Sequence, residues 1–179
     1  MFQIRIHGRG GQGVVTAAEM LSIAAFIEKK YAQAFPSFGS ERMGAPVVAF
    51  CRISDKEIRL REPISTPDAI IIQDKTVIKP ANALSGIVNG GYVLVNSSEC
   101  DLALPSHLKA KCIDATQIAI EQVGRPIPNS VLLGSFAALT GIISIDSVIQ
   151  AINTKFAGAI AEKNVKAAQI AYEKTLGEK

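Results

Sequence analysis

The sequence contains no tryptophan, and aromatic residues make up only 6% of its 179 residues. Nineteen basic residues stand against 16 acidic ones, which gives a net charge of +3, and the basic residues form no polybasic run. Domains that bind nucleic acids usually present a strongly basic face, often with aromatic side chains on which bases stack. We therefore expect no nucleic-acid partner.

Metal-ligating residues are also few. Cys51, Cys100 and Cys112 are far apart in the sequence and form no C-x-x-C pair, and His7 and His107 are the only histidines. This spacing favours neither a zinc site nor an iron–sulfur cluster within the chain. Three scattered cysteines are typical of a reducing compartment, and we expect each to be a small core residue.

Two further absences narrow the class of protein. No apolar run is long enough to cross a membrane, and no signal peptide is evident, so we expect a soluble cytoplasmic protein without a membrane partner. The sequence has no G-x-S-x-G elbow, no phosphate-binding loop with its lysine, and no metal-ligand spacing. We therefore assign no catalytic residue to this chain alone.

The most informative stretch is a glycine-rich turn, His7-Gly8-Arg9-Gly10-Gly11-Gln12-Gly13. It joins a predicted strand, Phe2–Ile6, to a predicted buried helix, Val14–Ile27, and its glycines fit G-x-G-x-x-G. The first amides of a helix have no internal partner, so this helix start favours an anion. Arg9 adds a positive charge, Gln12 adds an amide, and His7 adjoins the turn.

Two other interpretations of the turn stay open. A dinucleotide site needs an acidic residue about 20 positions on, at the end of a second strand. Glu28 has roughly this spacing, but it lies where the first helix is expected to end. The second interpretation is structural, because glycines also allow a strand and a helix to pack closely.

A second unusual stretch is the loop Pro36–Pro46, which follows a possible short strand, Tyr31–Phe35. The loop carries Phe38 and Met43 beside Glu41 and Arg42, a mixture that is typical of binding loops. Arg42 could equally be a surface arginine that pairs with Glu41 or with solvent.

The rest of the chain alternates strands and helices. We predict a β-hairpin from Val47–Ile53 and Glu57–Leu60, buried strands at Asp68–Asp74 and Tyr92–Asn96, and a last strand at Lys109–Asp114. A short helix is expected at Thr76–Leu84, although Pro80 weakens it. Asp114 and Gln117 resemble a capping box that opens the helix Ala115–Val123.

The chain is expected to be helical from Val131 to its end. The segment Val131–Leu139 is apolar all round and should be buried, with Asn129 as its possible N-cap and Gly141 at its end. Ser144 or Asp146 should cap the next helix, which runs through Ile152, and Lys163–Leu176 is an amphipathic closing helix. The pattern predicts one α/β domain, 1–179. We expect a Rossmann-like open sheet, mostly parallel with a β-hairpin insertion, with helices on both faces and a helical C-terminus.

Two motifs together carry a family resemblance. The glycine turn and Phe35–Pro46, with the strand Val47–Ile53 after them, resemble the gamma subunit of 2-oxoacid:ferredoxin oxidoreductases, and the likeness extends over nearly the whole chain. Later landmarks are Asp68–Asp74, Gly91–Asn96 and Pro128–Gly134. The loop is similar to that of the pyruvate branch, with 2-ketoisovalerate enzymes close by. Met43 stands where an arginine is expected, which leaves Arg42 as the better candidate for an anion contact.

The resemblance implies a non-autonomous subunit of a heterotetramer. Such complexes oxidatively decarboxylate pyruvate, join the acetyl group to coenzyme A as co-substrate, and reduce ferredoxin or flavodoxin. Alpha and beta subunits carry thiamine diphosphate and Mg, and a delta subunit carries the iron–sulfur clusters, so this chain binds no cofactor by itself. The candidate residues for the coenzyme A side are Gly8, Arg9, Gly10, Gly11, Gln12, Gly13, Ser40, Arg42, Gly44 and Asn129.

Two alternatives from other classes remain. A stand-alone α/β protein would bind NAD or another nucleotide through the turn. An interaction scaffold with a vestigial turn would dock onto partners without touching the chemistry. Exposed apolar docking surfaces would also favour a homodimer of the isolated chain.

Overall fold

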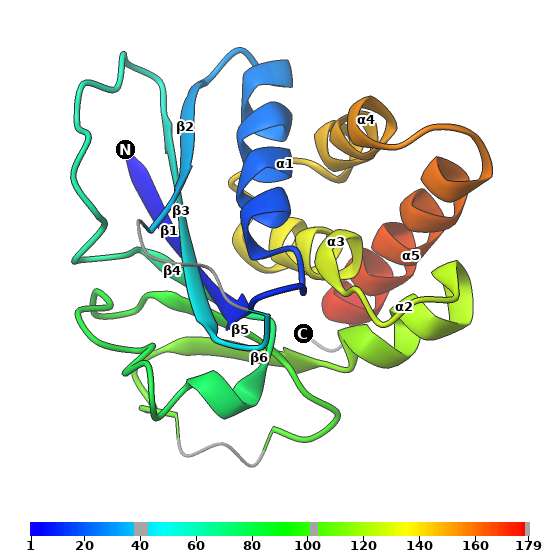
Figure 1. Cartoon of the computed structure of the whole chain (residues 1–179). Coiled ribbons are helices and arrows are strands. Elements are labelled where there is room, and N and C mark those ends of the chain that lie inside the picture. The colour runs from blue at the N-terminus through cyan, green and yellow to red at the C-terminus, as the bar shows by residue number, and fades with distance from the viewer. Residues whose placement is uncertain (38–42, 101–103, 178–179) are drawn as a thin grey trace.

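The computed structural model describes residues 1–37, 43–100 and 104–177. Six strands form one sheet in the order β2-β3-β1-β4-β5-β6. Their bounds are β1 Phe2–Arg9, β2 Tyr31–Pro36, β3 Pro46–Ser54, β4 Ala69–Ile72, β5 Tyr92–Asn96 and β6 Lys109–Ile113. The α-helices pack against the sheet as a second layer (Figure 1).

The sheet is mostly parallel, as predicted. Strand β1 runs parallel to β4, and β4, β5 and β6 continue in parallel register. Strand β3 is antiparallel to both β1 and β2, and it pairs Cys51 with Ile4 on one side and with Ala34 on the other. The carboxyl ends of β1, β4, β5 and β6 therefore meet at one edge, where ligands of open α/β sheets bind.

The predicted hairpin is wrong in its second strand. Residues Glu57–Leu60 form no strand, and the antiparallel partners of β3 are β1 and β2. Both edges of β3 are thus already occupied by longer apolar strands, so the returning segment has no edge on which to pair. It instead runs past the buried side chain of Arg52, whose Nη2 donates to the carbonyl of Glu62 at 2.5 Å.

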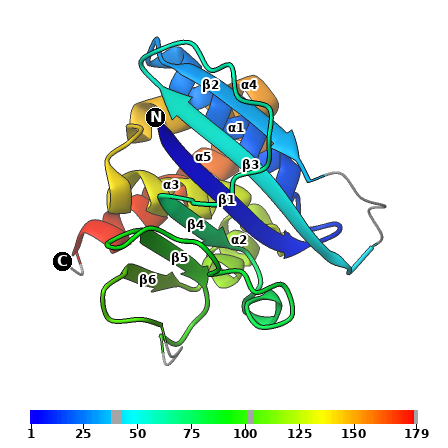
Figure 2. The same ribbon diagram turned by 90° about the vertical axis from the view of Figure 1, so that its left-hand side faces the viewer.

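The α-helices among the described residues cover one face of the sheet (Figures 1 and 2). Helices α1 to α5 share a large apolar core with side chains of that face, such as Ile4, Ile6 and Ile71. The opposite face carries a smaller cluster around Ile70, Ile72 and Val95. Helices were expected on both faces of the sheet. Among the described residues, α-helices cover one face, and the other face carries only a short 3₁₀ helix.

The smaller cluster is covered by a short 3₁₀ helix, η1 (Lys75–Val77), and by turns. A helix over Thr76–Leu84 was predicted, but the helical turn ends at Val77. Pro80 lacks a backbone N–H, and Asn82 adopts a positive φ of 43°, so a regular helix cannot continue through this segment.

The ends of helices α1 and α2 lie where the local sequence predicts them. Helix α1 spans Val14–Ile27 and α2 spans Ala115–Val123, both as predicted. The Asp114 side chain accepts a hydrogen bond from the Gln117 amide at 3.0 Å, but the Gln117 side chain donates to Glu121 at 2.8 Å instead of returning to the cap. Only half of the capping box is therefore formed.

The last three helices complete the helical layer, and α3 is buried along most of its length. Helix α3 spans Asn129–Thr140 and ends at Gly141, α4 spans Ile145–Lys155 with Ser144 as its cap, and α5 spans Gly158–Gly177. Helices α3 and α5 cross closely at Gly134, where a Cβ atom would overlap the carbonyl group of Ala168. Helix α5 is longer than the predicted Lys163–Leu176 at its amino-terminal end.

The cysteines differ from the prediction that each is a core residue. Cys51 is free and buried in the core, whereas Cys100 and Cys112 form a disulfide. Cys112 lies on the edge strand β6, within reach of the chain that follows β5, so the pairing depends on strand order and not on sequence spacing. No helix in the described parts of the chain is long and apolar enough to span a membrane.

Candidate functional site

The glycine turn begins later than the sequence suggests. Strand β1 continues to Arg9, so His7 and Gly8 are strand residues, and the turn proper leads from Gly10 to α1. A Cβ atom on Gly8 would lie 2.7 Å from Cγ2 of Val14. Gly13 has a φ of 74°, and a side chain there would meet the carboxamide of Asn129. Close packing of strand, turn and helix therefore accounts for these two glycines.

The turn also borders an open cavity at the start of α1. Helix α1 has no side-chain cap at Gly13, so its first amides are left for other acceptors. The cavity has a volume of about 290 Å³ and is lined by Arg9, Gly10, Gly11, Gly13, Val14, Val15, Thr16 and Val47. An anion placed there would meet the amino-terminal end of the helix dipole.

Arg9 is held in place by three groups. Its Nε donates to Thr76 Oγ1 at 3.0 Å and lies 3.3 Å from Oδ2 of Asp74, and its Nη1 donates to the carbonyl of Gly44 at 2.9 Å. Partial burial raises the pKa of Asp74, but hydrogen bonds from Thr76 and Gln12 and the charge of Arg9 outweigh it and lower the pKa. Arg9 therefore fastens the turn to the end of β4 and is not a free cation.

The side chain of Gln12 forms hydrogen bonds across the turn. Its side-chain oxygen accepts a hydrogen bond from the Arg9 amide at 2.8 Å, and its side-chain nitrogen donates to Asp74 Oδ2 at 3.1 Å. The same Asp74 carboxylate thus binds both Arg9 and Gln12. The turn is consequently rigid before any ligand arrives.

The structure brings the end of the Pro36–Pro46 loop against the turn. The amide of Gly10 donates to the carbonyl of Ala45 at 2.9 Å, and the amide of Gly44 donates to the carbonyl of Gly10 at 3.1 Å. Met43 bridges to Gly10 and is 87% exposed, so its side chain is available to a ligand or a partner. Ser40 and Arg42 lie outside the described residues, and their roles stay predictions.

Three amide side chains beside the turn, two buried and one half-buried, were only partly predicted from the sequence. Asn129 is the first residue of α3 and not its cap, which is Pro128. Its Oδ1 accepts a hydrogen bond from Gln73 Nε2 at 2.9 Å, and Asn96 Nδ2 donates to the carbonyl of Gln73 at 2.8 Å. Gln73 and Asn96 were missed, although both directly follow the apolar runs of β4 and β5, at the edge where polar residues meet.

Two residues considered from the sequence lie away from the cavity. His7 is only 4% exposed and faces away from the helical layer, since the adjacent Ile6 belongs to the helix-side core. Glu28 lies beyond the far end of α1, about 21 Å from the turn at 1.5 Å per residue. Its Oε1 accepts a hydrogen bond from the Ser144 amide at 2.6 Å, so it cannot hold a ribose beside the turn.

No group of three or more His, Cys, Asp or Glu side chains that could hold a metal ion is found within the described ranges. The residues brought together at the turn are glycines, amides and one arginine that is paired with the carboxylate of Asp74. Such a set can bind an anion or order an interface, and it offers no nucleophile or proton-transfer pair.

The chain matches the family model described as "Pyruvate ferredoxin/flavodoxin oxidoreductase" over residues 3–174. The pyruvate synthase subunit PorC of Methanothermobacter marburgensis is 51% identical over 174 residues, which cover 97% of each chain. The pyruvate/ketoisovalerate oxidoreductases common subunit gamma of Thermococcus litoralis is 48% identical over 181 residues, which cover 98% of each chain.

Among solved structures, the crystal structure of the pyruvate oxidoreductase subunit PORC from Thermotoga maritima is similar throughout. It matches with a TM-score of 0.83 and 34% identity, and the match covers 96% of this chain and 95% of the other. The two chains therefore share one fold over nearly their whole lengths.

Proposed function

The chain belongs to the pyruvate ferredoxin/flavodoxin oxidoreductase family, and from this we propose that it is the gamma subunit of a multisubunit 2-oxoacid:ferredoxin oxidoreductase. The observation that carries the proposal is the near-complete coverage, 97% of both chains, at 51% identity to a pyruvate synthase subunit. Pyruvate is the proposed substrate of the complex.

The proposed reaction joins an oxidation to an acyl transfer. Pyruvate loses carbon dioxide, its acetyl group is bonded to the sulfur of coenzyme A, and two electrons pass to ferredoxin or flavodoxin. We assign thiamine diphosphate and Mg to the alpha and beta subunits and the iron–sulfur clusters to the delta subunit. The three cysteines of this chain support that assignment, because two form a disulfide and Cys51 is buried.

The choice of 2-oxoacid is assigned to other subunits. The gamma subunit of Thermococcus litoralis is described as common to pyruvate and ketoisovalerate oxidoreductases, so that subunit serves two substrates. By analogy, a 2-ketoisovalerate or other 2-oxoacid enzyme is the alternative for this chain. The alternative is decided by assaying the purified complex with each acid.

For the turn we propose a place on the coenzyme A side of the complex. Coenzyme A carries phosphates, and the cavity at the start of α1 offers helix amides to an anion. Met43 and Gly44 bring the Pro36–Pro46 loop to the same cavity, so Ser40 and Arg42 of that loop are proposed to reach the ligand or the adjoining subunit. Asn129 and Gln73 fix the wall behind Gly13.

The test compares the two substrates of the complex. Arg9→Ala removes the positive charge that offsets the Asp74 carboxylate beside the cavity, and it removes the hydrogen bond to Gly44, so an anion is bound less well. We expect the KM for coenzyme A to rise about tenfold, the equivalent of about 1.4 kcal/mol, with little change in the KM for pyruvate. Arg59→Ala is the matched control, since Arg59 forms an exposed ion pair with Glu57 and does not line the cavity.

Equal increases in both KM values would contradict the binding role and favour a role in assembly. The family assignment itself is tested by affinity purification of the chain from its source. Recovery of larger subunits with coenzyme A-dependent pyruvate oxidation, followed with a dye acceptor, is expected. A chain recovered alone, inactive and binding NAD, would refute the assignment and support a stand-alone nucleotide-binding protein.

A further inference from the structure

A second cavity lies where the end of α2, the start of α3 and the start of α5 come together (Figure 1). Its volume is about 260 Å³. It adjoins the glycine turn through Asn129, which lines the cavity and whose carboxamide faces Gly13. None of the other residues that line this cavity belongs to the site at the start of α1.

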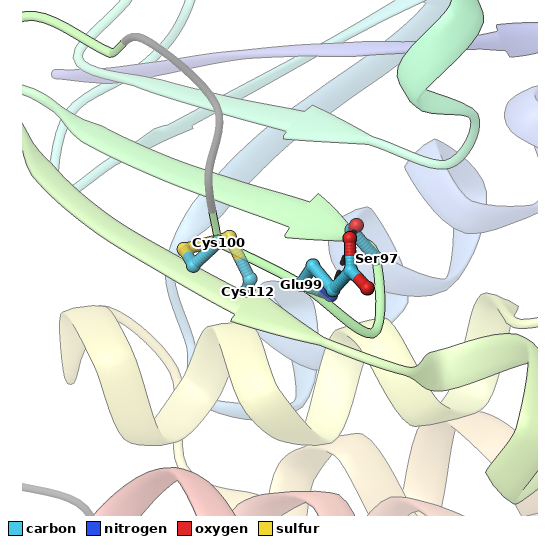
Figure 3. The surroundings of a disulfide bond; sticks show 4 residues. All are labelled: Ser97, Glu99, Cys100 and Cys112. Carbon is cyan, nitrogen blue, oxygen red and sulfur yellow. Dashed lines mark hydrogen bonds between the residues drawn. A yellow bond between two sulfur atoms is a disulfide. The ribbon is translucent and has the colours of Figure 1, made fainter.

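The charged side chains that line this cavity are all positive. They are Arg125, just after α2, and Lys163 of α5, and both are exposed. Neither forms a hydrogen bond or an ion pair with any residue that the structure describes. The cavity beside the disulfide (Figure 3) differs in this respect, because the carboxylates of Asp114 and Glu121 are part of its lining. The cavity at the start of α3 therefore favours a negative group.

The floor of the cavity adds polar donors that are held in place. Asn129 is only 4% exposed, and its Oδ1 already accepts the hydrogen bond from Gln73. Its Nδ2 donates to none of the described residues and is not fully enclosed, so it remains open to an incoming acceptor. Helix α3 starts here with Pro128 as its cap and without a side-chain cap, which leaves its first amides free. Both features favour an anion at this end of the cavity.

The remaining wall of the cavity is apolar. It is formed by Val123, Ile127, Phe156, Ala159 and Ile160. Ile127 is 41% exposed and Ile160 is 55% exposed, so both still have apolar surface to bury. An inorganic anion would leave this surface in water, and a neutral hydrocarbon would leave the two cations without a counter-charge. A ligand that combines a negative group with a hydrocarbon body satisfies both parts of the lining.

We propose that this cavity is a binding site for a small amphipathic carboxylate, of the size of a branched-chain or aromatic acid. The hydrocarbon body lies against Ile127, Phe156 and Ile160. The carboxylate lies towards Arg125 and Lys163 and accepts a hydrogen bond from Asn129 Nδ2. This site is separate from the proposed coenzyme A side, and it can be tested on the full-length chain alone.

The experiment titrates the full-length chain with 4-methylpentanoate and follows isoleucine methyl groups by NMR. The methyl signals of Ile127 and Ile160 should shift along one saturable curve with a dissociation constant of about 0.1–5 mM. Ile78, which packs on the opposite face of the sheet, should not respond. The neutral 4-methylpentanamide should bind about three- to twentyfold more weakly because it lacks the charge, and propanoate should bind at least about tenfold more weakly because it lacks most of the hydrocarbon.

Two kinds of variant separate this cavity from general surface charge. Lys163→Gln should weaken binding of 4-methylpentanoate about two- to fivefold. Lys166→Gln, on the same helix but outside the cavity lining, should leave it unchanged. Ala159→Leu fills the cavity without changing any charge, and it should weaken binding at least about tenfold. Ala159 is exposed, so the variant should keep the wild-type melting temperature.

Several results would overturn the proposal. These are equal affinities for the acid and its amide, no saturation up to tens of millimolar, or unchanged binding in Ala159→Leu. Where partner subunits are recovered with the chain, the titration is repeated on the assembled complex. Loss of carboxylate binding there would show that a segment of an adjoining subunit fills the cavity, and it would also overturn the proposal. The proposed function is judged separately, by the coenzyme A-dependent activity of that complex.

Discussion

Lowering the pH from 7 to 5 should destabilise the chain through one buried side chain, His7. Neither ring nitrogen of His7 has a hydrogen-bond partner among the residues that the structure describes. Burial, together with the charge of Arg5, lowers the pKa of His7 from 6.5 to about 4. In the unfolded chain His7 takes up a proton near pH 6.5, whereas in the folded chain it stays neutral until about pH 4.

The sign and size of the effect follow from proton linkage. Because the unfolded state binds the extra proton, the free energy of unfolding is fully retained above pH 6.5 and is lost as the pH falls towards 4. With these two pKa values the loss between pH 7 and pH 5 is about 2 kcal/mol, and over the whole window it is about 3 kcal/mol. A typical domain has only about 5–15 kcal/mol to lose, so the effect is measurable.

The assay is urea-induced unfolding of the isolated chain at pH 7, 6 and 5, at fixed protein concentration. His7→Leu removes the titrating group and two unpartnered nitrogens, so its free energy of unfolding should vary little over this range. His107→Gln is the control, since His107 is an exposed histidine. A wild-type free energy that does not change with pH, or a loss that persists in His7→Leu, would refute the reasoning.

Two further predictions concern the helical layer. Gly134→Ala would push a Cβ atom into the backbone of Ala168, and we expect a cost of about 1–3 kcal/mol, seen as a melting temperature lower by about 2–12 °C, whereas Gly177→Ala, which meets no atom within 4 Å, should change little. Partial burial raises the pKa of Glu28, but hydrogen bonds from Ser144 and Lys30 outweigh it and lower the pKa to about 2. Glu28→Gln should therefore cost about 1–3 kcal/mol at pH 7 and reduce, by about the same amount, the loss of stability that the wild type shows as the pH falls from about 4.5 to 2. Both effects are measured by urea unfolding, and an unchanged acid profile would contradict this role.

Features that depend on neighbouring residues could be predicted from the sequence. Helix α1 starts where Gly13 gives way to a long apolar run, α3 ends at Gly141, and α4 starts at Ser144. Each of these signals acts within one turn of helix. The buried strands β4 and β5 were equally clear, because strands covered on both faces are continuous apolar runs.

Features that depend on strand order could not be predicted in the same way. Because β3 pairs with both β1 and β2, it has no free edge on which Glu57–Leu60 could form a strand. The sequence of those four residues does not indicate that the edge is occupied. The disulfide and the Asp74 partner of Arg9 likewise depend on which strands become neighbours. For the candidate site, the turn and Gly44 were expected together from the family resemblance, and the structure adds Asp74, Gln73 and Asn96 to them.

The position of β3 also governs the order in which the sheet can assemble. Strands β1 and β2 are consecutive in sequence but are held apart in the sheet by β3, which is made later. A chain still growing on the ribosome has no strand to insert between them until residue 54 has emerged. In its first 36 residues, β1 therefore has no partner on either side, and β2 lacks the partner that β3 later provides. Closure of such non-local pairs is entropically slow, so the amino-terminal third is the part of the nascent chain most in need of protection from aggregation.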